Sequence, residues 1–227
     1  MKASPSARSW IAAGVRHELF LRVLPALRHD MAAPVSVLRM GLLMLKRQVA
    51  APGIDAAACA QRVALIDEQL GVLVDGIRSL RDWELAATGE GIGRAALVAQ
   101  CTALLGAAFD LGGIAISVDP ALEPADDAQA PRWPAAAALR YLTLGALCHL
   151  HDSVPRLGAI HIEPDGADAL RLRAEPRAAE APSQALVTHR APRSLAIDAV
   201  SLQCLAEDLG HAIRVERTAV RFALASA

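Results

Sequence analysis

Three neighbouring residues, His29, Asp30 and Pro34, have types and a spacing that could support nucleophilic chemistry. An imidazole is a nucleophile near neutral pH, and an adjacent carboxylate can orient the ring or accept its proton. The apolar residues around them fall on steps of three and four, which predicts a helix packed against other helices, with His29 and Asp30 facing outward. These residues are Leu24, Met31, Val35, Leu38, Leu42, Leu45 and Val49. On periodicity alone, a solvated surface histidine without a function is the commoner interpretation.

The order His29, Asp30, Pro34 and then an apolar helical stripe resembles the H-box of the dimerisation and histidine-phosphotransfer domain of sensor histidine kinases. The resemblance implies that His29 accepts a phosphoryl group on a ring nitrogen, that Asp30 assists, and that the helix bends at Pro34. Ala32 and Ala33 depart from the family, which usually has Arg at the first position and Thr or Asn at the second. The second departure argues against the phosphatase activity of many members.

Two helical segments must position this motif. A first helix is expected from Ser9 to Leu24, with a kink or break at Pro25 before the H-box helix. After the turn signal at residues 51–53, a second helix runs to about Leu85, and its stripe consists of Val63, Ile66, Leu70, Leu73, Ile77 and Leu80. A lone antiparallel hairpin cannot cover both stripes, so a homodimeric four-helix bundle through residues of about 20 to 86 is expected, within a first domain of residues 1–88.

The second expected domain, residues 89–227, has a mixed pattern of helices and strands. Its order is helix, strand, helix, two strands, helix, two strands, at 94–108, 114–118, 135–151, 159–163, 169–173, 195–209, 213–215 and 220–224. This order resembles the ATP-binding α/β sandwich of histidine kinases and gives an α+β fold class overall. The stretch 89–93, GEGIG, is interpreted as a linker rather than a dinucleotide loop, because no βαβ unit surrounds it.

The family's nucleotide-binding motifs are missing from this domain. Gly145 and His149 stand where the family has two asparagines four residues apart, one of which holds magnesium. Residues 174–177, AEPR, replace an Asp-x-Gly-x-Gly motif, and 174–192 leaves little room for an ATP lid. Phosphoryl transfer from ATP needs magnesium ligands and backbone donors around the phosphates. We therefore expect a degenerate domain that binds no cofactor.

The composition of the chain restricts the classes of molecule that it is expected to bind. The 227-residue chain has a formal net charge of -1 and a pI near 6.7, so neither nucleic acid nor a membrane is expected as the partner. No uninterrupted apolar run is long enough to cross a bilayer, and the N-terminal segment does not resemble a signal peptide, so a cytoplasmic location is expected. The four scattered cysteines are expected to be free thiols, and no metal site is expected.

Taken together, these features resemble the dimeric histidine phosphotransferases of bacterial phosphorelays. The resemblance implies that His29 carries a phosphoryl group between response-regulator receiver domains, which bring their own Mg²⁺. It also implies a hybrid histidine kinase as a further candidate partner. Candidate receiver-docking residues are Ala32, Ala33, Val37 and Met40. Three alternatives stay open: a non-catalytic pseudokinase-like dimer that modulates a kinase or regulator, a true kinase with an atypical nucleotide site, and an unrelated helical interaction module with a small α/β domain.

Overall fold

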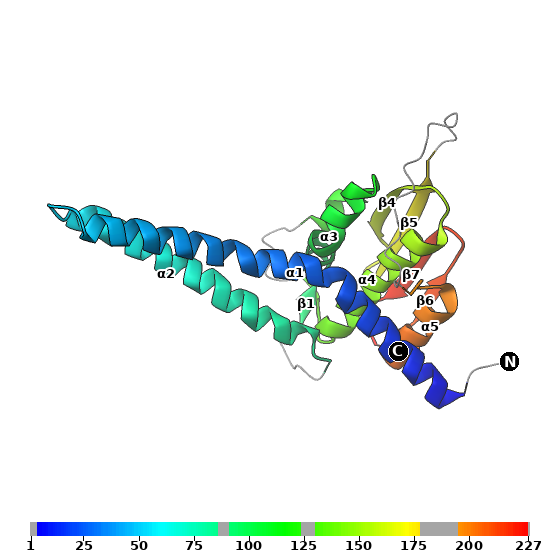
Figure 1. Cartoon of the computed structure of the whole chain (residues 1–227). Helices are drawn as coiled ribbons and strands as arrows, with labels where there is room; N and C mark the ends of the chain where they lie inside the picture. The colour runs from blue at the N-terminus through cyan, green and yellow to red at the C-terminus, as the bar shows by residue number, and fades with distance from the viewer. Residues whose placement is uncertain (1–3, 86–90, 124–129, 178–194, 227) are drawn as a thin grey trace. The chain divides into compact units, whose positions relative to one another are not determined.

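The computed structural model describes residues 4–85, 91–123, 130–177 and 195–226 (Figure 1). The chain divides into two compact units, a helical unit of Leu24–Ala87 and an α/β unit of Met1–Val23 together with Thr88–Ala227. The α+β class expected from the sequence is confirmed. The first 23 residues group with the α/β unit, whereas the sequence placed them in a helical domain of residues 1–88.

The helical unit is an antiparallel pair. Its first helix is part of α1 (Pro5–Val49), which runs through both units, and its second is α2 (Ala56–Ser79), followed by the single turn η1 (Leu80–Trp83). Asp55 caps α2 by accepting hydrogen bonds from the backbone N–H groups of Ala57 and Ala58.

Helix α1 is continuous through both of its prolines. A kink or a break was expected at Pro25, and of these two the break is wrong, because residues 5–49 form one helix. Proline removes one backbone donor but its φ angle is compatible with a helix, and the side chains of Val23 and Leu27 on either side are buried. Burial of this apolar face offsets the lost hydrogen bond.

The α1–α2 contact uses only half of the apolar stripe that the sequence indicates. The covered positions of α1 repeat on steps of four and three and are Leu27, Met31, Pro34, Leu38, Gly41, Leu45 and Gln48. Gly41 matters because a Cβ atom there would lie 3.0 Å from Ile66 Cγ1 of α2. The expectation of a single stripe needs correction, since Val35, Leu42 and Val49 are about half exposed.

The α/β unit contains a mixed five-stranded sheet of order β2-β4-β5-β7-β6, in which β2 and β4 are parallel and the other neighbours are antiparallel. The expected order of elements is confirmed. In sequence the elements are α3 (Arg94–Leu111), β2 (Ala115–Val118), η2 (Pro120–Leu122), α4 (Ala136–Ser153), β4 (Leu157–Pro164), β5 (Ala169–Pro176), α5 (Ala199–Asp208), β6 (Ile213–Val215) and β7 (Ala219–Ala223).

Two short strands were not foreseen. Strand β1 (Ile92–Gly93) pairs with β3 (Arg132–Trp133), so the expectation of a linker over 89–93 is wrong for its last two residues. Gly91 precedes β1 with φ +78°, and a Cβ atom there would lie 2.7 Å from the carbonyl oxygen of Trp133. Only glycine fits this close approach.

Helices α3, α4 and α5 cover one face of the sheet (Figure 1). Helix α4 is buried on every side from Ala137 to Leu150, because the sheet lies beneath it and the first turns of α1 pack above it. Those turns bury Ala12, Val15, Leu19 and Val23.

Helix α3 is, within the described residues, the helix that is long and apolar enough to cross a bilayer by length and composition alone. The sequence reading had found no such stretch. Five of its side chains are buried in the unit, and it contacts α4 and β2.

Candidate functional site

His29 lies on the solvent-exposed side of α1, as the apolar spacing predicted. Asp30 is exposed as well. Successive residues of a helix do not face one another, and no hydrogen bond joins these two side chains in the described structure. A role for Asp30 in orienting the ring therefore needs a change of rotamer or an approaching partner, and it stays a prediction.

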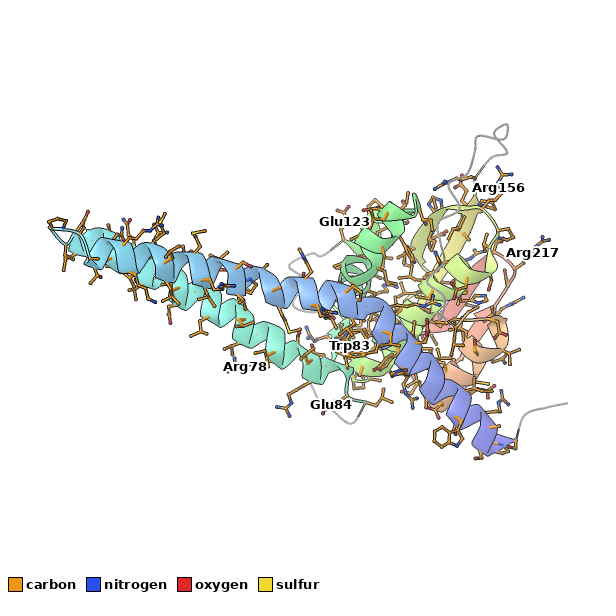
Figure 2. The ribbon with its side chains drawn as sticks, in the orientation of Figure 1. Arg78, Trp83, Glu84, Glu123, Arg156 and Arg217 are labelled. Atoms are coloured by element: carbon orange, nitrogen blue, oxygen red, sulfur yellow. The ribbon has the colours of Figure 1, made fainter. Side chains whose placement is uncertain are left out.

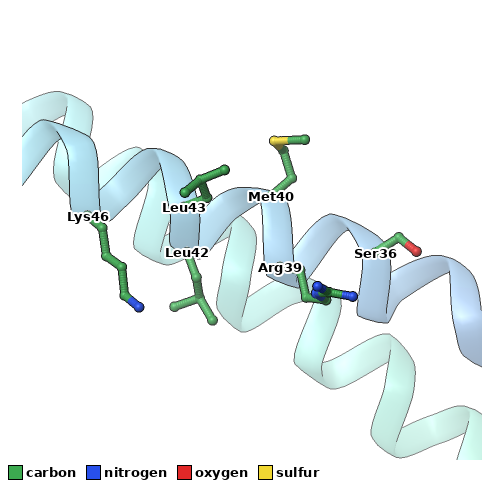
Figure 3. Close-up of a pocket in the computed structure, with 6 residues that line it drawn as sticks. All are labelled: Ser36, Arg39, Met40, Leu42, Leu43 and Lys46. Atoms are coloured by element: carbon green, nitrogen blue, oxygen red, sulfur yellow. The ribbon is translucent and has the colours of Figure 1, made fainter.

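The face of α1 that carries His29 is defined by the helical repeat, which brings residues three and four apart into line. From His29 this line runs through Ala33, Ser36, Met40 and Leu43, all exposed, with Met40 at 57 % and Leu43 at 46 %. Figure 3 shows Ser36, Met40 and Leu43 projecting from the same side of α1. The histidine thus stands at one end of an exposed stripe of small and apolar side chains, called here the His29 face.

The four residues expected to dock a receiver are all exposed, but they do not share one face. Ala33 and Met40 belong to the His29 face, whereas Ala32 and Val37 flank it on opposite sides. Leu43 was missed by the sequence reasoning, although the spacing of 4, 3, 4 and 3 residues from His29 could have identified it.

Pro34 faces the other way, into the covered seam between α1 and α2. Because it has no N–H, it cannot bond the carbonyl of Asp30, the residue four positions earlier. Two residues further on, the Ser36 hydroxyl donates a hydrogen bond to the carbonyl of Ala32 at 3.1 Å. Pro34 therefore acts as a structural residue next to the His29 face.

The two α4 positions at which the sequence resemblance would place asparagines, Gly145 and His149, are in contact with neighbouring protein groups. A Cβ atom on Gly145 would lie 3.0 Å from Leu202 and 3.2 Å from Leu205 of α5. His149 is buried, with Nδ1 2.8 Å from the carbonyl oxygen of Ile197 and 3.1 Å from the Ser153 hydroxyl. Both positions contact neighbouring protein groups.

Residues 174–177, where the resemblance would place an Asp-x-Gly-x-Gly motif, also contact other parts of the α/β unit. Glu175 pairs with His161 Nε2 at 2.8 Å, and the Arg177 guanidinium donates hydrogen bonds to the carbonyls of Gly112 and Gly113 at the end of α3. The expected lid segment lies outside the described residues from position 178 to 192. No group of three or more metal-ligating side chains occurs in the described parts of the chain.

A buried ionic hub joins the first part of α1 to α4. Arg22 donates two hydrogen bonds to the Asp152 carboxylate, at 3.2 and 2.8 Å, and others to Glu18 and to the carbonyl of Leu195. Burial tends to raise the pKa of Asp152, but hydrogen bonds from His151, Arg22 and the Ile197 backbone outweigh it and lower the pKa to about 2. The Asp152 carboxylate is therefore ionised at neutral pH.

Comparisons with known proteins give limited similarity. No family model matches the chain, and no curated protein matches it. Among solved structures, the Acinetobacter baumannii histidine kinase AdeS is 13 % identical, with 86 % of this chain and 98 % of that chain covered and a TM-score of 0.33. A histidine kinase from Burkholderia phymatum STM815 is 13 % identical, with 88 % and 99 % covered and a TM-score of 0.33. These scores are too low to assign a fold or an activity.

Proposed function

We propose that this chain is a histidine phosphotransferase of a two-component phosphorelay, in which His29 carries a phosphoryl group between receiver aspartates. The observation that carries the proposal is the exposed His29 at the end of an exposed stripe of small and apolar residues. A nucleophile needs access to the phosphorus atom, and a partner domain needs a surface beside it.

In the proposed reaction, a ring nitrogen of His29 attacks the phosphorus of a receiver's aspartyl phosphate in line. The N–P bond forms as the acyl P–O bond breaks, and the receiver aspartate leaves as a carboxylate. The receiver's own Mg²⁺ balances the charge on the transferring group. Transfer to a second receiver reverses these steps, so the phosphotransferase itself needs no nucleotide.

A homodimer is part of the proposal, and the second half of each apolar stripe supports it. On α1 the exposed members are Val35, Leu42 and Val49, and on α2 they are Val63, Leu70 and Ile77, each set repeating every seven residues and each side chain 40 to 54 % exposed. Each exposed set lies roughly a quarter turn from the covered set, in the same rotational sense along its own helix. Because the helices are antiparallel, both sets come to one side of the hairpin, where a second hairpin would bury them.

Leu70→Glu tests this dimer against a matched control, Val72→Glu. Val72 is 51 % exposed on another side of the same helix. We expect analytical ultracentrifugation to show a dimer for wild type and Val72→Glu and a monomer for Leu70→Glu. A wild-type monomer at tens of micromolar would refute the dimer.

We propose further that the chain binds no ATP. The packing of Gly145 against α5 and the two contacts of His149 support this, because a nucleotide there would have to displace side chains of the core. The location is proposed to be cytoplasmic.

The transfer itself is tested with His29→Ala and the control His17→Ala, since His17 is another exposed histidine of α1. Each protein is offered a ³²P-labelled receiver domain from the same genome and, separately, labelled ATP with Mg²⁺. We expect label from the receiver on wild type and His17→Ala and none on His29→Ala. Label from ATP would instead show a kinase.

A second candidate is a non-catalytic dimer that binds and modulates a kinase or regulator. The departures at Ala32 and Ala33 favour it. In this case no receiver labels the protein, and His29→Ala leaves receiver affinity within about twofold of wild type, whereas Met40→Glu weakens it.

A further inference from the structure

The face of the sheet opposite to the helices carries a row of arginines across three adjacent strands. The register places Arg171 of β5 directly opposite Arg221 of β7, and Arg221 directly opposite Arg214 of β6. Directly opposite residues of antiparallel strands point to the same face, with Cβ atoms about 5 Å apart. All three side chains are exposed.

This arrangement is unfavourable without a compensating anion, because like charges directly opposite each other destabilise a sheet. Two acids compensate it in part, since Asp165 forms an ion pair with Arg221 and Glu216 pairs with Arg214 at 3.2 Å. Glu163 of β4 lies directly opposite Arg171, but among the residues that the structure describes Arg171 forms no ion pair with it or with another acid. By contrast, Arg173, two residues along the same strand and face, pairs with Glu163.

The three arginines and the two acids line one depression of about 220 Å³, together with Ala219. Its ionised groups leave a net positive charge. Guanidinium groups present planar sets of donors that bind oxyanions, often in pairs of parallel hydrogen bonds. Groups that come from three neighbouring strands reach a common centre from different directions, which suits a tetrahedral anion with at least three oxygens better than a planar carboxylate.

We propose that this depression binds a compact oxyanion of the phosphate class, either free phosphate or the phosphate group of a small monoester. Arg171 is the principal ligand, because the nearest carboxylate, that of Glu163, pairs with Arg173 and leaves the Arg171 guanidinium without an ion pair among the described residues. Arg221 and Arg214 complete the site. The proposal is independent of the phosphotransferase activity, since it uses none of the residues near His29.

The test uses the full chain and follows the arginine Nε–H signals by NMR during titration with potassium phosphate at constant ionic strength. Wild type should show a saturable shift in the millimolar range, and Arg171→Gln at least a tenfold weaker one. Arg78→Gln, which replaces an exposed arginine of α2 outside the depression, should leave the shift unchanged. Titrations with glycerol 3-phosphate show which form of phosphate the site prefers. A lower dissociation constant for the monoester identifies a phosphorylated small molecule as the ligand, and a lower one for phosphate identifies the free ion.

Thermal unfolding provides a second measurement, because phosphate would not change the unfolding temperature through a face that only contacts solvent. At low ionic strength without phosphate, Arg171→Gln should unfold at a higher temperature than wild type because the repulsion is relieved, and phosphate should remove this difference. The proposal is overturned if phosphate gives no saturable shift, if acetate competes equally well, or if Arg171→Gln and Arg78→Gln lose binding to the same extent.

Discussion

Replacing Asp152 by Asn should destabilise the α/β unit, because its carboxylate is the centre of the buried ionic hub. Only 3 % of the Asp152 side chain is exposed, and it accepts hydrogen bonds from Arg22, from His151 and from the backbone N–H of Ile197. Breaking a buried pair by removing one partner costs about 3 to 5 kcal/mol. Asn keeps a hydrogen-bond acceptor and Glu18 still contacts Arg22, so we expect about 3 kcal/mol.

Part of the stabilisation by the Asp152 carboxylate should be lost in acid, because the pKa of this group is lower in the folded protein than in the unfolded chain. Its folded pKa of about 2 lies below the ordinary value of 3.8, so the contribution is complete above about pH 4 and is lost as the pH falls towards 2. The difference between the two values corresponds to about 2 kcal/mol. The gap between wild type and Asp152→Asn should therefore shrink from about 3 to about 1 kcal/mol in acid.

Urea unfolding followed by far-ultraviolet circular dichroism at pH 7 and pH 2.5 measures both quantities. Asp110→Asn is the control, because Asp110 is an exposed acid of α3 in the same unit. It should change the free energy of unfolding by less than about 0.5 kcal/mol at pH 7. The reasoning is refuted if Asp152→Asn behaves like Asp110→Asn, or if its deficit is as large at pH 2.5 as at pH 7.

Two further predictions concern packing and thiol chemistry. Gly41→Leu should destabilise the helical hairpin by about 1 to 3 kcal/mol, because the new side chain would collide with Ile66, and a lower thermal midpoint of α-helical ellipticity would show it. At pH 8, Ellman's reagent should react first with half-buried Cys59, whereas Cys101 and Cys148 should react only on unfolding. The reason is that burial raises the pKa of each of these two thiols to about 12. Fast reaction of Cys101 and Cys148 in the native protein would contradict this.

The elements of the α/β unit could be predicted from the sequence because each carries a local signal. Strand β6 was placed at its observed ends, and the turn at Gly166, with φ +71°, lies between β4 and β5 as its composition indicated. Strands β1 and β3 have two residues each. A two-residue strand has no periodicity, so the pairing of β1 with β3 could not be predicted from the sequence.

The sequence could not predict which element of the structure covers a given apolar stripe. Ala12, Val15, Leu19 and Val23 recur on helical spacing, so a covered face was visible in the sequence. Spacing shows that a face is buried but not which element buries it. The sequence reading therefore assigned this segment to the hairpin, whereas Arg22 and its neighbours bind the α/β unit.

Because spacing alone does not show what covers a helix face, each side of α1 has to be considered by itself before it supports a function. Between Leu27 and Val49 the helix has a covered side, an exposed apolar side that matches one on α2, and the His29 face with Met40 and Leu43. A hairpin that served only as a spacer would need the first side alone. A dimer would need the second, and either proposed function would need the third as a docking surface. Only phosphotransfer requires the imidazole itself, so substitution of His29, rather than of its neighbours, separates the two candidate functions.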